Sequence, residues 1–192
     1  EANAWIFTFF VPHDVPALIE LLGGDEGFVA KLDQFFADGH FDPSNEPSFH
    51  IPWLYNYAGV PHKTQERVRQ IFSSAFHTGP GGLPGNDDAG ATSAWYVLAA
   101  LGLYPVAPGS GMLQLSSPLV ERATIHLHPS FYGGGTFVIE VEGQAPDNHY
   151  IQSVSLDGAA LQRTYITHEE IVRGGTLYFV LGPEPSSWGV GG

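Results

Sequence analysis

The sequence contains no cysteine and few basic residues. Its 192 residues include 7 Lys and Arg against 20 Asp and Glu, giving a formal net charge of −13. The lack of cysteine excludes disulfides and thiolate metal sites. The shortage of cations argues against a nucleic-acid partner, because phosphates are neutralised by Lys and Arg. No apolar run is long enough to span a bilayer, so we expect no membrane partner. An acidic chain suits a cation or a neutral polar substrate.

Charged residues are also scarce, whereas glycine and proline are abundant. Asp, Glu, Lys and Arg make up 14 % of the chain, which contains 24 Gly and 15 Pro. This charged fraction is low for a free-standing domain. With so many aromatic residues, it predicts surfaces that other protein covers. The first residue is Glu rather than Met, so we expect the start to be processed, trimmed or internal.

Helical patterns in residues 1–111 give way to strand patterns in residues 112–192. Helices are predicted after the N-cap Asp14, from Asp25, over Pro61–Phe76 and over Ser93–Leu101. The predicted strands are 112–115, 123–127, 136–141, 150–156 and 176–181. These segments predict an α+β fold with two regions, in which antiparallel strands form part of a sandwich. Helix pairs joined by long loops favour a helical toroid for the first region. Residues 184–192 are interpreted as a tail.

A glycine-rich turn with two adjacent carboxylates, Asp87 and Asp88, opens the helix that begins near Ser93. A carboxylate at this place can accept from the free N–H groups of the first helical turn. Taken alone, the pair is therefore typical of a helix cap. The alternative is a catalytic pair, with Asn86 beside it.

The loop 39–57 carries three prolines, which prevent a continuous helix up to Pro52. Asn45 and Glu46 offer hard oxygen ligands that suit calcium better than a transition metal. The spacing is not that of an EF-hand, so the pattern alone is a weak metal signal. The aromatic residues that follow, Trp53 among them, are either a sugar-stacking platform or core packing.

Several motifs together resemble the glycoside hydrolase family 92 α-mannosidases. The motifs are Glu1–Trp5 with Val11–Asp14, Asn45–Tyr57, Gly85–Gly90, Ser93–Val97, and Tyr150–Ser153 with Ile166–Ile171. The resemblance implies the C-terminal part of a much longer, calcium-dependent, inverting exo-α-mannosidase that is secreted or periplasmic. Its fold would pair an (α/α)6 barrel, to which residues 1–111 contribute, with an N-terminal β-sandwich. Ile6 departs from the family's usual Gln, which removes one amide contact.

Inverting hydrolysis of a glycosidic bond needs a general acid and a general base about 6.5–9.5 Å apart. This separation leaves room for the water that the base activates on the opposite face of the sugar. Combined with the resemblance, this assigns Glu1, which has aromatic neighbours, as the acid. Asp88 becomes the base, with Asp87 as the other candidate. The expected calcium ligands are Asn45, Glu46 and Asp88. The expected substrate-binding residues are Trp5, His13, Asp14, His50, Trp53 and Asn86.

The function expected from these residues is calcium-dependent hydrolysis of α-linked mannose, with α-1,2 linkages of N-glycans or mannans as the leading substrates. We expect the remainder of the same polypeptide, including the rest of the barrel and the N-terminal sandwich, to be required. Two alternatives stay open at this point. The same loops suit a non-catalytic calcium-dependent carbohydrate-binding module, or a structural domain with rigid loops.

Overall fold

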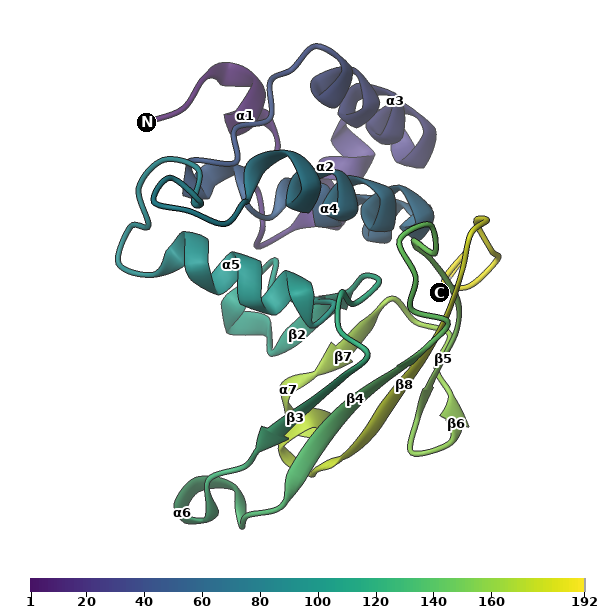
Figure 1. Cartoon of the computed structure of the whole chain (residues 1–192). Helices are drawn as coiled ribbons and strands as arrows, with labels where there is room; N and C mark the ends of the chain where they lie inside the picture. Colours follow the sequence, from purple (N-terminus) through teal and green to yellow (C-terminus); the bar gives the residue numbers. More distant parts are fainter. Residues whose placement is uncertain (192) are drawn as a thin grey trace.

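A computed structural model describes residues 1–191 as a helical region followed by a region of β-strands (Figure 1). The helices and 3-10 helices of the first region are α1 (Ala4–Thr8), α2 (Val15–Leu21), α3 (Gly24–Ala37), η1 (Glu46–Ser48), η2 (Ile51–Ala58), α4 (Pro61–Ala75) and α5 (Ala91–Ala100). The second region adds η3 (Pro108–Ser110), α6 (Pro129–Tyr132) and α7 (His168–Val172). Helices preceding strands confirm the predicted α+β class. Among the described residues, no helix is both long and apolar enough to cross a membrane.

The helix starts follow the capping residues closely. Asp14 is the N-cap of α2, and its Oδ1 accepts from the amide of Ala17 at 3.1 Å. Helix α3 begins at Gly24, one residue before the predicted start, because Gly23 adopts a left-handed conformation at the cap position. The predicted inner face of α3 is confirmed, since Phe28, Leu32 and Phe35 have no exposed surface.

The proline-rich loop forms short helical turns instead of one helix. Pro47 lies in the first turn of η1 and Pro52 in the first turn of η2, where a missing amide proton leaves no bond unmade. The turn α1 near the N-terminus was not predicted. Asn3 caps it by accepting from the amide of Ile6 at 3.1 Å.

Two sheets make up the second region. The strands are β1 (Leu103–Tyr104), β2 (Met112–Leu115), β3 (Arg122–His126), β4 (Thr136–Glu142), β5 (Tyr150–Leu156), β6 (Ala159–Ala160), β7 (Tyr165–Thr167) and β8 (Gly175–Gly182). One sheet has the order β1-β2-β7 and the other β3-β4-β8-β5-β6. The expectation of purely antiparallel strands is wrong for one pair, because β8 inserts between β4 and β5 and runs parallel to β4.

Each region has its own apolar core. The first gathers residues from Ile6 to Val106, and the second gathers residues from both sheets, including Leu115, Ile166 and Phe179. The interpretation of residues 184–192 as a tail is wrong for the described part up to residue 191. Trp188 is buried, and its indole N–H donates to the carbonyl of Leu161 at 2.8 Å. Gly192 lies outside the described residues.

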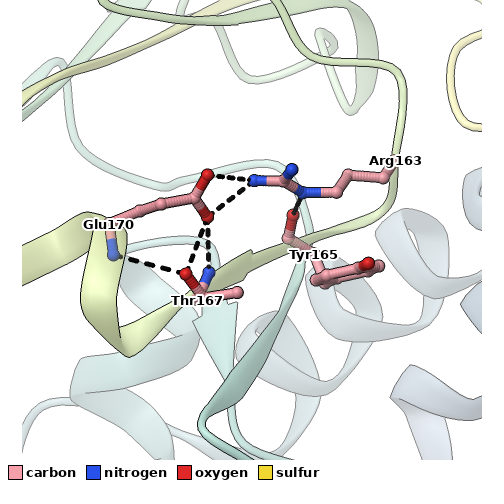
Figure 2. Close-up of polar contacts among 4 residues, drawn as sticks. All are labelled: Arg163, Tyr165, Thr167 and Glu170. Atoms are coloured by element: carbon pink, nitrogen blue, oxygen red, sulfur yellow. Dashed lines mark hydrogen bonds and ion pairs between the residues drawn. The ribbon is translucent and has the colours of Figure 1, made fainter.

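A polar cluster joins β7 to α7 (Figure 2). The guanidinium of Arg163 reaches both carboxylate oxygens of Glu170, at 2.5 and 2.6 Å. Thr167 and Glu170 form a capping box in which each side chain bonds the other residue's backbone amide. Burial raises the pKa of Glu170, but hydrogen bonds from Thr167 and Arg163 outweigh it and hold the pKa below its usual value.

Candidate functional site

Three segments that are distant in the sequence meet on one side of the helical region. The side-chain amide of Asn45 donates to the backbone carbonyl of Glu1 at 2.7 Å. Gly85 packs on the residue before Asn45, since a Cβ at Gly85 would lie 2.6 Å from the Cβ of Ser44. Gly85 also has a φ of +64°, so this approach requires glycine twice over. The start of the chain, the loop with Asn45 and the turn before α5 therefore lie together (Figure 1).

The two adjacent aspartates differ in their surroundings. Asp87 Oδ1 accepts from the amide of Ser93, in the first turn of α5, at 2.8 Å. Asp88 is exposed, and no hydrogen bond or ion pair to residues 1–191 engages its carboxylate. The backbone at Asp88 and Ala89 is left-handed, with φ of +45° and +57°. Two consecutive non-glycine residues in this region indicate strain, which is commonly found at functional sites.

The expected calcium ligands supply oxygen atoms but no complete cluster. Asn45 and Glu46 are half-buried, and Glu46 begins η1. Within residues 1–191, no group of three or more His, Cys, Asp or Glu is arranged to hold a metal ion. Since calcium takes six to eight oxygen ligands, these two residues fit as part of such a site.

His50 and Trp53 are held inside the helical region. The ring nitrogen Nε2 of His50 donates to the carbonyl of Phe9 at 2.8 Å, and burial lowers the pKa of His50. Trp53 is fully buried and stacks on Tyr104, with ring centroids 5.4 Å apart. A fully buried ring suits core packing and not a sugar platform, so the candidate site does not include Trp53.

The remaining expected contacts lie near the surface. Trp5 stacks on His40 with ring centroids 4.5 Å apart. His40 was not singled out from the sequence, although it belongs to the same proline-rich loop. His13, Asp14 and Asn86 are exposed, and the carboxylate of Asp14 is already used as the cap of α2.

A groove of about 1380 Å³ runs between α4, the turn before α5 and the loop before β5. Its apolar lining includes Phe72, Phe76 and Tyr96, and Gly85 lines it as well. Glu1, Asn45 and Asp88 do not line this groove. The polar residues of the candidate site are therefore carried by an exposed edge, and the turn at Gly85 connects the two features.

A family model and the solved structures agree on one family. The model of the glycosyl hydrolase family 92 catalytic domain matches residues 1–183. An uncharacterized secreted glycosidase of Arthroderma benhamiae is 41 % identical over the whole chain, which covers 24 % of that protein. A family GH92 alpha-mannosidase of Bacteroides thetaiotaomicron, solved with mannoimidazole, is 30 % identical with a TM-score of 0.92, over 99 % of this chain and 27 % of that chain.

A second solved structure, a GH92 inverting mannosidase of Bacteroides thetaiotaomicron, is 33 % identical with a TM-score of 0.88. The match covers 98 % of this chain and 28 % of that one. The chain thus spans about a quarter of the length of these relatives.

Proposed function

The chain belongs to glycoside hydrolase family 92, and from this premise we propose that it supplies part of the active site of an inverting exo-α-mannosidase. The observation that carries the proposal is the meeting of three segments, through the bond between Asn45 and Glu1 and the contact of Gly85 with Ser44. This bond and this contact bring together the three segments that contain the acids Glu1, Glu46 and Asp88. The mannosidase and inverting chemistry named for the solved relatives supports the reaction type.

Glu1 and Asp88 take different proton roles in this proposal. Asp88 is the base that accepts the proton of the attacking water, because its carboxylate is exposed and not engaged by the described residues. Asp87 is the positioning residue, since it holds the first turn of α5 and so fixes the strained turn beside it. Glu1 is the acid that protonates the leaving oxygen.

The same edge would hold calcium through the amide oxygen of Asn45 and the carboxylate of Glu46, with Asp88 nearby. Their hard oxygen atoms support this assignment. When bound there, the ion would supply positive charge that orients the hydroxyl groups of the sugar. Trp5, whose ring carries His40 stacked on it and Lys31 Nζ 4.7 Å from its centroid, would border the sugar through its ring edge, and Asn86 would offer a polar contact.

Further polypeptide completes the site in this proposal, as the remainder of an (α/α)6 barrel. Glu1 is exposed in this chain, whereas a general acid retains its proton best when covered. Helix α5 presents an apolar outer surface, with Tyr96 41 % and Val97 56 % exposed. A helix that is apolar on all sides is normally buried. We also propose secretion, which the name of the Arthroderma relative supports.

The first experiment measures free mannose released from an α-1,2-linked mannobiose by the polypeptide that carries this chain, with and without a chelator. We expect turnover that the chelator abolishes. Calcium-dependent binding of mannobiose without turnover would instead favour a non-catalytic carbohydrate-binding module. Turnover that persists after calcium is removed would contradict the role of the ion.

Glu1→Gln tests the acid. The variant should lose most activity on mannobiose and much less on an activated aryl mannoside, whose leaving group needs no proton. Equal losses on both substrates would contradict the assignment of Glu1 as the acid.

A second variant tests the metal ligand. Glu46→Gln should weaken calcium binding in calorimetry, while the matched exposed control Glu20→Gln should not. Parent-like calcium affinity in Glu46→Gln would refute the ligand assignment.

A further inference from the structure

A row of four aromatic rings lies at the far tip of the larger sheet, where α6 joins β3 to β4 (Figure 1). Neighbouring ring centroids are 5.2 Å apart for His128 and Phe131, 6.4 Å for Phe131 and Tyr132, and 5.8 Å for Tyr132 and His168. All four residues are exposed, and Phe131 is 78 % exposed. These residues, called the tip row here, belong to neither apolar core.

The tip row is held in place by local backbone geometry. Nδ1 of His128 accepts from the amide of Ser130 at 3.2 Å, which leaves the proton of the neutral ring on Nε2 as a free donor. Gly133 ends α6 with a φ of +73°, and two further glycines turn the chain into β4. Aromatic side chains have few torsions to order, so exposed rings lose little side-chain entropy when they bind a ligand.

The charges around the tip row select the class of ligand. The stretch 123–139 contains no Lys, Arg, Asp or Glu, although the chain carries a net charge of −13. Arg122 and Glu140, which flank this stretch, are paired with each other at 2.5 Å. Two exposed side chains of opposite charge flank the row on the α7 segment: Glu169, beside His168, and Arg173, beside Gly174, which packs on Thr136 of β4. The nearby charges are of both signs and the tip itself carries none, so it complements a neutral ligand.

We infer that the tip row is a binding site for a neutral glycan chain, separate from the candidate active site. Ring faces carry partial negative charge and pack against the polarised C–H groups of a sugar. The hydroxyl of Tyr132 and the Nε2 proton of His128 would bond sugar hydroxyls. Because the exposed rings follow one another with centroids 5.2 to 6.4 Å apart, they suit an extended polymer better than a single sugar. That the glycan is an α-mannan rests on the proposed function.

The test is calorimetric titration of the polypeptide that carries this chain with neutral α-mannan, with excess chelator present so that a calcium-dependent site is silent. The parent should bind weakly and Phe131→Ala roughly two- to tenfold more weakly. Adding Tyr132→Ala should weaken binding further. Leu21→Ala, which truncates an 81 % exposed apolar side chain on α2, is the matched control and should bind like the parent. Near-UV circular dichroism confirms that each variant is folded.

Three outcomes would overturn the inference: no binding of either mannan or dextran by the parent, parent-like binding by Phe131→Ala, or equal weakening by Leu21→Ala. Sedimentation addresses a different occupant. Self-association that Phe131→Ala abolishes, without any mannan binding, would assign the tip row to a second copy of this chain. Loss of mannoside turnover in Asp88→Asn with unchanged mannan binding would keep the two proposals distinct. Binding of neutral dextran but not mannan would retain the site and refute only the mannan assignment.

Discussion

Truncating Asp87 should destabilise the chain, whereas a conservative change at its neighbour should not. Asp87 Oδ1 accepts from the amide of Ser93 at 2.8 Å, within the first turn of α5, where amides have no helical partner. Removing such a hydrogen bond costs about 1 kcal/mol of the free energy of unfolding. For a chain of this size, that corresponds to a lower Tm by about 2–4 °C.

The assay is urea unfolding followed by near-UV circular dichroism on Asp87→Ala, Asp87→Asn and Asp88→Asn. Asn caps about as well as Asp, so Asp87→Asn should keep most of the stability. Asp88→Asn should unfold like the parent, because its carboxylate is not engaged by the described residues and Asn tolerates the left-handed backbone. Parent-like stability of Asp87→Ala, or a larger loss in Asp88→Asn, would refute this division of roles.

The other predictions concern pH and strain. The pKa of Glu170 is lowered in the folded chain, so the ionised carboxylate stabilises the fold above the ordinary pKa of Glu, and this stabilisation is lost as the pH falls below that value. Glu170→Gln should therefore flatten the decline of Tm below about pH 4.5. Burial lowers the pKa of His50, so protonation of His50 opposes folding and Tm should fall as the pH drops below about 6.5. His50→Gln should remove that part of the decline, and a pH profile of Tm like that of the parent would contradict this role of His50. Ala89→Gly should relieve the steric strain of a φ of +57° and raise the free energy of unfolding by up to about 1 kcal/mol in urea titration, since this relief exceeds the entropic cost of glycine. A free energy of unfolding below that of the parent would argue against strain at Ala89.

Local signals predicted much of the fold. Asp14 before Pro16 located the start of α2, and the strand patterns of β2 and β5 matched their observed bounds. The parallel pairing of β4 with β8 could not be predicted in this way. It depends on where the chain between the two strands crosses the sheet, a non-local property that residue alternation does not encode. Trp188 packs into the second core for the same kind of reason.

The candidate site was predictable in composition but not in arrangement. Asp87 and Asp88 are adjacent and chemically equivalent in the sequence. Only the structure shows that Asp87 accepts a hydrogen bond from the amide of Ser93, whereas the carboxylate of Asp88 is not engaged by the described residues. Trp53 and Tyr55 form an aromatic motif that suits a sugar platform equally well, yet both are fully buried. Aromatic motifs become informative only once burial is known, because ring faces serve packing and binding alike.

The most direct test of the active-site proposal is kcat on α-1,2-mannobiose for Asp88→Asn beside Asp87→Asn, in the polypeptide that carries this chain. An amide cannot accept the proton of the attacking water, so Asp88→Asn should lose about 10²–10⁴-fold in kcat. Asp87→Asn should stay close to the parent, because Asn still caps α5. Substantial turnover in Asp88→Asn, or an equal loss in both variants, would contradict the assignment of Asp88 as the base.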